Sequence, residues 1–285
     1  MAFSGTEYFQ PGDISYVMAG SSTHAVGLLY PGSSLQSRIG VFTVATNTAL
    51  VYGLPWSSGY NIPSGSMVYA ASAFWLQYNS GSAPFLIRID PSSWSVASVG
   101  SGGNPGAVTV CGDWIYGRQF KYNTTTDTLS THSNAQQHWG SVAGRLFAIS
   151  SVTLSEVDPS TDSVIDTWAL PYTGYGRGVA IGNRLFFRTQ IANSPFVWFD
   201  ASTDTVGLRT ASPATTWFST YQCTAHTDGY IYSVLDIGGG KRLQVLDPAT
   251  GRWFADYPVT NRDRGGVTSA GGKILLTSYD PSSWP

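Results

Sequence analysis

Short apolar runs rich in Val, Ile, Leu, Phe, Tyr and Trp alternate along this chain with clusters of Gly, Ser, Thr, Asn, Asp and Pro. Such runs, bounded by turn-forming residues, predict β-strands. No stretch shows the three-to-four-residue spacing of apolar positions that is typical of an amphipathic helix. The pattern therefore predicts an all-β protein.

One phrase recurs at the ends of these runs, in which Asp or Asn is followed by several small polar residues. Asp or Asn at the start of a turn accepts hydrogen bonds from backbone N–H groups two residues on, and a following Pro suits a type I turn. Each copy therefore predicts a strand, a tight turn and a second strand. The turn-initiating residues are Asp90, Asn123, Asp158, Asp200, Asp247 and Asp280, and Thr43 holds this place in a degenerate seventh copy.

A Gly-led run precedes each copy, as in residues 144–150 (GRLFAIS), and a strand of small residues precedes that run, as in residues 106–112 (GAVTVCG). In the second unit we assign the Gly-led run to residues 65–71 and a loop to residues 71–84. Each unit then has four antiparallel strands. Units of about forty residues with four strands describe the blades of a β-propeller.

Seven such units fill the 285 residues without a linker, so we expect one domain over residues 1–285. The seventh unit ends soon after Asp280 and lacks a fourth strand. We expect the strand-like segment Thr6–Gln10 to supply it, because that join would remove two exposed sheet edges. The alternative is a loose N-terminal tail. The expected fold is an all-β seven-bladed propeller of four-stranded blades, closed by the N-terminal strand.

Charge is sparse, at 11% of residues with a formal net charge of -2. We expect no nucleic-acid partner, because nucleic-acid binding needs a basic surface. No apolar run is long enough to span a bilayer, and no signal peptide is visible. We interpret Cys111 and Cys223 as buried thiols on the inner strands of units three and six, consistent with folding in a reducing cytoplasm.

No catalytic or metal motif stands out among the titratable residues. Glu7 and Glu156 lack a partner in any recognisable pattern, and the four histidines show no metal-ligand spacing. His226 could reach a central channel, although a structural hydrogen bond is the simpler interpretation. Residues 236–243 (DIGGGKRL) lack the helix and Ser or Thr of a phosphate loop. We expect no cofactor and no bound metal.

A binding surface is expected on the face opposite the uniform turns, where connections vary in length. Aromatic and Arg side chains in these connections are candidate contacts, because Trp, Tyr and Arg dominate interface hot spots and aromatic rings stack on sugars. Filling of the gaps between wedge-shaped blades is the alternative. The candidates are Trp75, Tyr78, Trp139, Tyr172, Tyr175, Arg177, Trp217, Phe218, Tyr221, Arg262 and Arg264.

The Asp-Pro-Ser/Ala-Thr turns and the Gly-led strands resemble those of the YVTN-type, Kelch-like and quinoprotein-like β-propellers along essentially the whole chain. This resemblance implies the fold and hardly constrains the function. The low content of Lys and Glu, the abundance of Ser, Thr, Gly and aromatic residues, and the unpaired cysteines also resemble a tailed-phage virion protein.

We therefore expect a non-enzymatic assembly or binding module in a phage virion, as part of a tail, nozzle or fibre. Its partners would be other virion proteins or a host surface, presented as protein or glycan. Two alternatives remain open: a propeller lyase or hydrolase with a metal in its channel, and a glycan-binding lectin.

Overall fold

The computed structural model describes residues 14–30, 36–57, 67–79, 84–101, 108–132, 138–150, 152–172, 178–188, 196–208, 223–225, 228–236, 241–259 and 267–276. Within these segments there are strands and turns and no helix, so the predicted all-β class is confirmed. The strands form six antiparallel sheets of four strands and one of two strands. We number the sheets 1 to 7 in chain order.

The strands of each sheet follow one another directly along the chain. Sheets 1 to 3 consist of β1 (Ile14–Gly20), β2 (His24–Tyr30), β3 (Gln36–Thr43), β4 (Thr48–Ser57), β5 (Met67–Ala70), β6 (Ala73–Asn79), β7 (Pro84–Ile89), β8 (Val96–Ser101), β9 (Thr109–Cys111), β10 (Trp114–Tyr116), β11 (Phe120–Asn123) and β12 (Thr128–Thr131). Sheets 4 to 7 consist of β13 (His138–Val142), β14 (Arg145–Ser150), β15 (Thr153–Val157), β16 (Val164–Ala169), β17 (Val179–Ile181), β18 (Arg184–Arg188), β19 (Phe196–Asp200), β20 (Thr205–Leu208), β21 (Cys223–Ala225), β22 (Ile231–Asp236), β23 (Lys241–Asp247), β24 (Arg252–Val259), β25 (Val267–Ala270) and β26 (Lys273–Leu276).

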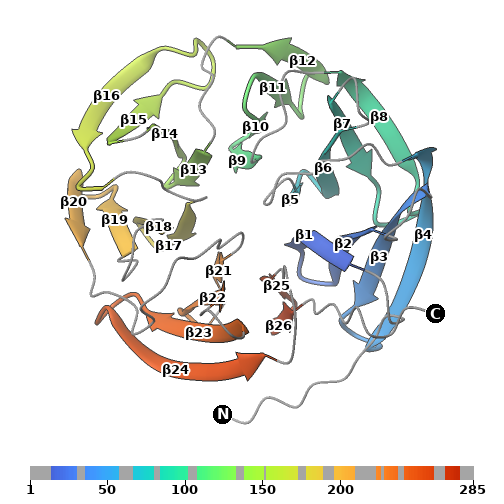
Figure 1. Cartoon of the computed structure of the whole chain (residues 1–285). Coiled ribbons are helices and arrows are strands. Elements are labelled where there is room, and N and C mark those ends of the chain that lie inside the picture. The colour runs from blue at the N-terminus through green and yellow to red at the C-terminus, as the bar shows by residue number, and fades with distance from the viewer. Residues whose placement is uncertain are drawn as a thin grey trace.

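The sheets are arranged around a central axis, with the first strand of each nearest the centre and the fourth strand outermost (Figure 1). The first strand of every sheet contacts the first strand of the next. This series runs from β1 through β5, β9, β13, β17 and β21 to β25, and β25 contacts β1 again. The arrangement is compatible with a propeller-like fold.

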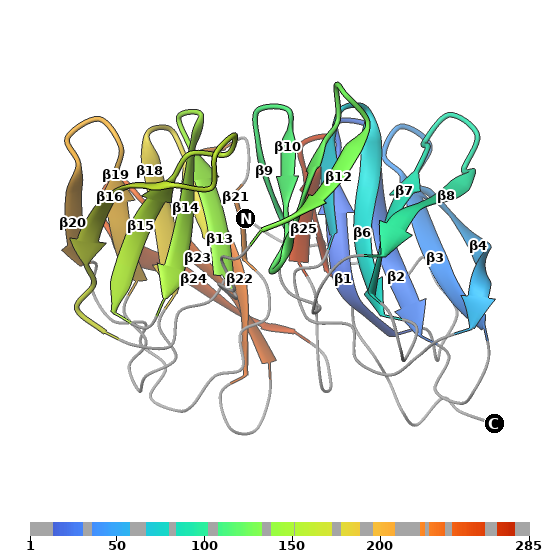
Figure 2. The same cartoon turned by 90° about the horizontal axis from the view of Figure 1, so that it is seen from above.

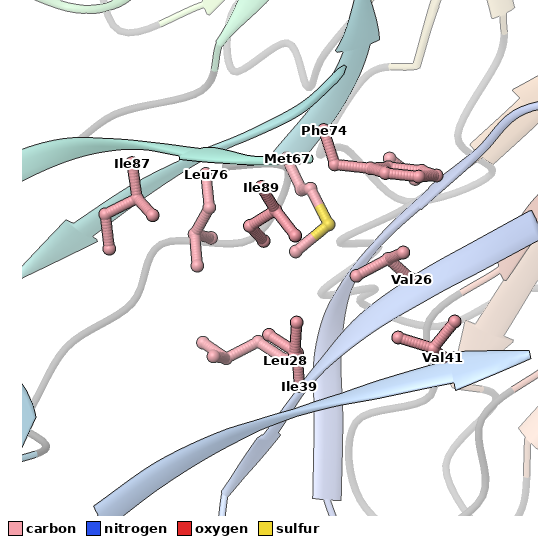
Figure 3. Close-up of a cluster of buried hydrophobic side chains, with 10 residues drawn as sticks. Val26, Leu28, Ile39, Val41, Met67, Phe74, Leu76, Ile87 and Ile89 are labelled. Atoms are coloured by element: carbon pink, nitrogen blue, oxygen red, sulfur yellow. The ribbon is translucent and has the colours of Figure 1, made fainter. Parts of the chain in front are cut away.

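Apolar side chains are buried between neighbouring sheets, and each pair of neighbours shares one cluster. Between sheets 1 and 2, Val26 and Ile39 face Met67, Phe74 and other aliphatic side chains (Figure 3). This division of the core follows from strand alternation, because residues on both faces of a central strand meet a neighbouring sheet. The stability of the fold therefore resides largely in contacts between sheets.

Sheets 7 and 1, which lie at opposite ends of the sequence, are in direct contact. Ala25, Phe42 and Ala270 form a shared buried cluster, and Gly271 N donates to the carbonyl oxygen of Ser21 at 3.0 Å. The segment Thr6–Gln10, which we expect to close the ring, and the turn residue Asp280 lie outside the described residues.

The turns between third and fourth strands share one hydrogen-bonding scheme. The side-chain oxygen of the initiating residue accepts the backbone N–H of the residue two positions on, at distances of 2.7 to 3.0 Å. The described initiating residues are Asp90, Asn123, Asp158, Asp200 and Asp247. This contact compensates backbone donors that would otherwise be unpaired at the turn.

The fourth residue after the initiating position has a positive φ in each of these five turns and in the turn that begins at Thr43. We call it the turn-closing residue. The turn-closing residues are Asn47, Trp94, Asp127, Asp162, Asp204 and Gly251. Most are Asn, Asp or Gly, which tolerate the left-handed region best.

The assignment of the second sheet from the sequence was wrong by one strand. Residues 67–70 form β5, the innermost strand, and most of the expected loop over residues 71–84 is the second strand, β6. The turn between them consists of Ala71 and Ser72, both with positive φ (47° and 57°). Glycine usually occupies such positions, because L-residues rarely adopt a positive φ. Here alanine and serine take its place, so the sequence lacks the glycine that would have indicated a turn.

Candidate functional site

The two ends of the sheets differ in their connections. Turns between first and second strands and between third and fourth strands lie at one end, which we call the turn end (Figure 2). Because the strands alternate in direction, all other connections leave from the opposite end, the loop end. These connections range from residues 151–152, between β14 and β15, to residues 209–222, between β20 and β21. Variation of this kind is typical of a recognition surface on a rigid scaffold.

Three of the candidate contact residues, Trp75, Tyr78 and Trp139, lie within strands, not within loops. Trp75 in β6 is 2% exposed and packs in a tilted arrangement against Tyr122 of sheet 3, and its indole Nε1 donates to the carbonyl oxygen of Ala70 at 3.0 Å. Trp139 in β13 is 0% exposed and packs against Tyr116. Both rings fill the wedge between neighbouring sheets, the alternative that the sequence had left open.

The other candidates divide by what the structure describes. Tyr172 is half-buried and packs against the apolar cluster between sheets 4 and 5. Tyr78 lies near the loop end of β6, and its side chain is outside the described part. The remaining seven also lie outside it: Tyr175, Arg177, Trp217, Phe218, Tyr221, Arg262 and Arg264. Their role in binding stays a prediction.

Apolar side chains are exposed among the described residues of the loop end. Val152, in the connection between β14 and β15, and Leu208, at the end of β20, are each 47% exposed. The carbonyl oxygen of Val152 accepts the backbone N–H of Leu170 at 2.7 Å, which fixes this connection against the end of β16. The loop end of sheets 4 and 5 thus exposes apolar side chains, and a hydrogen bond fixes the backbone at Val152.

At the turn end, a buried cation joins sheets 3 and 4. The Lys121 ammonium group lies 2.9 Å from an Asp162 carboxylate oxygen and donates to the carbonyl oxygens of Pro159 and Ser160 at 3.1 Å each. The Tyr116 hydroxyl lies 2.6 Å from the Pro159 carbonyl oxygen and 2.9 Å from Asp162. Burial, together with the Asp162 charge, raises the pKa of the Tyr116 hydroxyl.

Arg145 makes an equivalent contact between sheets 4 and 5. Its guanidinium forms a two-point ion pair with Glu156 at 2.9 and 2.6 Å, and it also lies 2.6 Å from Asp204 and 2.9 Å from the Ala201 carbonyl oxygen. The hydrogen bonds to both carboxylates raise the pKa of Arg145. The Glu156 side chain is therefore held by Arg145.

The same relation occurs between sheets 7 and 1. Lys273 donates to the Val44 carbonyl oxygen at 3.3 Å and to the Asn47 side-chain oxygen. Between sheets 1 and 2 an aromatic version occurs, in which His24 meets Trp94 edge-on with ring centroids 5.1 Å apart. In each case a residue of one sheet contacts the turn-closing residue of the next. We call these contacts inter-sheet staples.

Sequence reasoning missed the staples. Arg145, Lys273 and His24 each open the second strand of their sheets, and each reaches the turn-closing residue of the following sheet. Alignment of the repeat units on these two positions could have found the pairing. Because the partners lie far apart in the chain, no local pattern points from one to the other.

The turn carboxylates have depressed pKa values. The Ser202 hydroxyl and Arg184, whose Nε lies 2.8 Å from a carboxylate oxygen, lower the pKa of Asp200 to about 2. Hydrogen bonds from Ser92, Ser160 and Thr250 likewise lower the pKa of Asp90, Asp158 and Asp247. These groups are therefore ionised at neutral pH and serve their turns.

The thiols lie on inner strands, as the sequence predicts. Cys111 in β9 is buried, its thiol lies 3.3 Å from the carbonyl oxygen of Gly144, and burial raises its pKa. Cys223 begins β21, and its side chain lies outside the described part.

In the part of the chain that the structure describes, no three His, Cys, Asp or Glu side chains lie together in a metal-binding arrangement. His226, the histidine considered for a channel role, is outside that part.

The described segments contain no helix of the length and apolarity that crossing a membrane requires. Comparison with known proteins adds no family: no protein-family model matches the chain, and no curated protein matches its sequence.

Proposed function

We propose that this chain is a closed seven-bladed β-propeller that serves as a rigid assembly or binding module, with its loop end as the recognition face. The observation that carries the proposal is the complete series of inner-strand contacts, which returns from β25 to β1 and has an apolar cluster at each of the seven junctions. In this proposal the N-terminal segment Thr6–Gln10 adds the outer strand of the seventh blade.

The staples support different roles for the turn end and the loop end of the blades. Lys121, Arg145 and Lys273 each hold a neighbouring blade at the turn end. Cations that are committed to structural contacts keep that end rigid and uniform. The loop end carries connections of variable length and exposed apolar groups such as Val152 and Leu208. A rigid scaffold with variable loops on one face suits recognition of a macromolecular surface.

For the setting, we propose a tailed-phage virion, in which the propeller is part of a tail, nozzle or fibre that folds in the host cytoplasm. Support comes from composition, with 11% charged residues and abundant Ser, Thr, Gly and aromatic residues. The partners would be other virion proteins or a host surface.

Closure of the ring has a direct test at the junction of blades 7 and 1. A methyl group added at Gly20 would lie 1.8 Å from the backbone oxygen of Ser269, so one of the two strands would have to move. We expect Gly20→Ala to lower the unfolding midpoint markedly. Gly53→Ala is the matched control in the same sheet, because nothing lies within 4 Å of the added methyl. Equal midpoints for the two variants would contradict a packed junction.

The binding role is tested by fractionation and by paired variants. We expect the chain to sediment with virus particles in a density gradient of lysate from the source organism. Among single substitutions, Trp217→Ala in a loop-end connection should weaken attachment, and Thr125→Ala in an exposed turn should not. A chain that never sediments with particles contradicts the virion setting, and equal loss in both variants contradicts the loop end as the recognition face.

A further inference from the structure

Three buried side-chain nitrogens near the boundary of blades 3 and 4 have no hydrogen-bond partner among the described residues. They are Arg118 Nε, His132 Nδ1 and Trp139 Nε1. His132 is 7% exposed and Trp139 is 0% exposed, so bulk water does not solvate these groups. A buried polar group without a partner costs free energy, and sites of this kind in native proteins are often bridged by an ordered water molecule.

His132 and Trp139 meet at the loop end of the boundary between blades 3 and 4, and Arg118 belongs to the connection between β10 and β11 in blade 3. His132 follows the outer strand β12, and its Nε2 lies 3.0 Å from the carbonyl oxygen of Gly117. Arg118 is the next residue after Gly117. The His132 and Trp139 rings meet edge-on, with centroids 5.4 Å apart at an interplanar angle of 76°. Both rings also pack against Tyr116.

The Gly117 contact fixes the hydrogen-bonding character of His132. A carbonyl oxygen can only accept, so Nε2 must carry the proton that bonds to Gly117. In a neutral ring Nδ1 then has a free lone pair and is an acceptor. The indole Nε1 of Trp139 is always a donor. The two rings that meet edge-on therefore carry one buried acceptor and one buried donor.

We propose that the protein binds one hydroxyl-type oxygen, a water molecule, between blades 3 and 4, where it accepts from the Trp139 indole N–H and donates to His132 Nδ1. Only an oxygen that donates and accepts at once satisfies both nitrogens. A carboxylate or carbonyl would satisfy the indole alone. The water links the start of blade 4 to the chain that leaves blade 3.

The site depends on a neutral His132. Burial lowers the pKa of His132 more than the carbonyl oxygens of Gly117 and Phe120 and the charge of Asp162 raise it, and Lys121 lowers it further. Because the folded pKa lies below the unfolded value, the unfolded chain binds more protons between the two values. Stability from this site is therefore complete above the unfolded pKa of about 6.5 and is lost as the pH falls toward the folded value.

Nitrogen NMR on tryptophan-labelled and histidine-labelled protein tests the proposal. We expect the Trp139 indole proton, assigned by its loss in Trp139→Phe, to show cross-relaxation with water and slow exchange. The His132 nitrogens should report a neutral ring protonated at Nε2. His132→Gln can keep the bond to Gly117 but lacks the acceptor at Nδ1. In that variant the indole proton should exchange about tenfold faster, while the other indole signals keep their positions.

Four outcomes overturn the proposal. A His132 ring protonated at Nδ1, or a Trp139 indole proton without contact to water, removes the donor and acceptor pair on which it rests. Unchanged indole exchange in His132→Gln shows that the two residues share no oxygen. Addition of ethanol or ethylene glycol tests the source of the hydroxyl: a shift of the Trp139 signal that saturates, and that His132→Gln abolishes, would assign the oxygen to a ligand and refute the water.

Discussion

Removal of the Lys121 charge gives a strong test of the staples. Lys121→Met keeps most of the side-chain volume and removes the ammonium group. The Lys121 side chain is 8% exposed. Asp162 would lose its ion-pair partner, and the Pro159 and Ser160 carbonyl oxygens would lose their donor. The Tyr116 hydroxyl would stay within reach of the carboxylate.

The expected cost follows from the burial of the two partners. Breaking a buried ion pair by removing one partner costs about 3–5 kcal/mol. The Asp162 side chain is 22% exposed, so water solvates part of the remaining charge. We therefore expect Lys121→Met to lower the free energy of unfolding by about 2–3 kcal/mol, below the range for a fully buried pair. For a chain of this size that corresponds to a fall in melting temperature of about 3–5 °C.

Urea unfolding followed by tryptophan fluorescence measures the effect, with calorimetry as a second probe. Arg252→Met is the control, because Arg252 is an exposed cation near another turn. In the double variant Lys121→Met/Asp162→Asn, the loss of unfolding free energy should be smaller than the sum of the single losses. The amide that replaces the Asp162 carboxylate is uncharged and needs no ion-pair partner. A loss below about 0.5 kcal/mol for Lys121→Met, the range of ordinary surface substitutions, would refute this account of the staple.

Three further predictions address packing, pH and thiol burial. A methyl group at Gly207 would lie 2.2 Å from the Trp198 ring, so Gly207→Ala should cost about 1–3 kcal/mol in urea unfolding; no change would show that the ring moves freely. Because the folded pKa of Asp200 is about 2, its hydrogen bond from Ser202 and its ion pair with Arg184 contribute stability above the unfolded pKa of about 4, and this stability is lost as the pH falls toward 2. The stability difference between wild type and Asp200→Asn should therefore shrink over that pH interval, and a constant difference would contradict the shift. Alkylation of Cys111, followed by peptide mass spectrometry, should be much slower in the folded chain than in urea, and equal rates would show an accessible thiolate.

The strands and turns could be predicted from the amino-acid pattern alone, because both depend on neighbouring residues. The Asp158 carboxylate, for example, accepts a hydrogen bond from the backbone N–H of Ser160, two residues away. A few consecutive residues are therefore enough to predict the turn. The small-residue inner strands, such as β9 and β17, were also predictable, since close packing near an axis restricts side-chain size. At Ala71 and Ser72, where no glycine indicates the turn, the strand assignment was wrong by one strand.

The contacts between side chains of different sheets became visible in the folded chain and not in its sequence. Trp75 and Trp139 read as loop aromatics, but the meeting of two sheets buries both rings. The partner of Lys121 is Asp162, and that of Lys273 is Asn47, near the other end of the chain. The sequence of a turn determines the backbone conformation of that turn, whereas a staple depends on the angle between neighbouring sheets. That angle is set by the packing of several sheets against one another, which no short stretch of residues encodes.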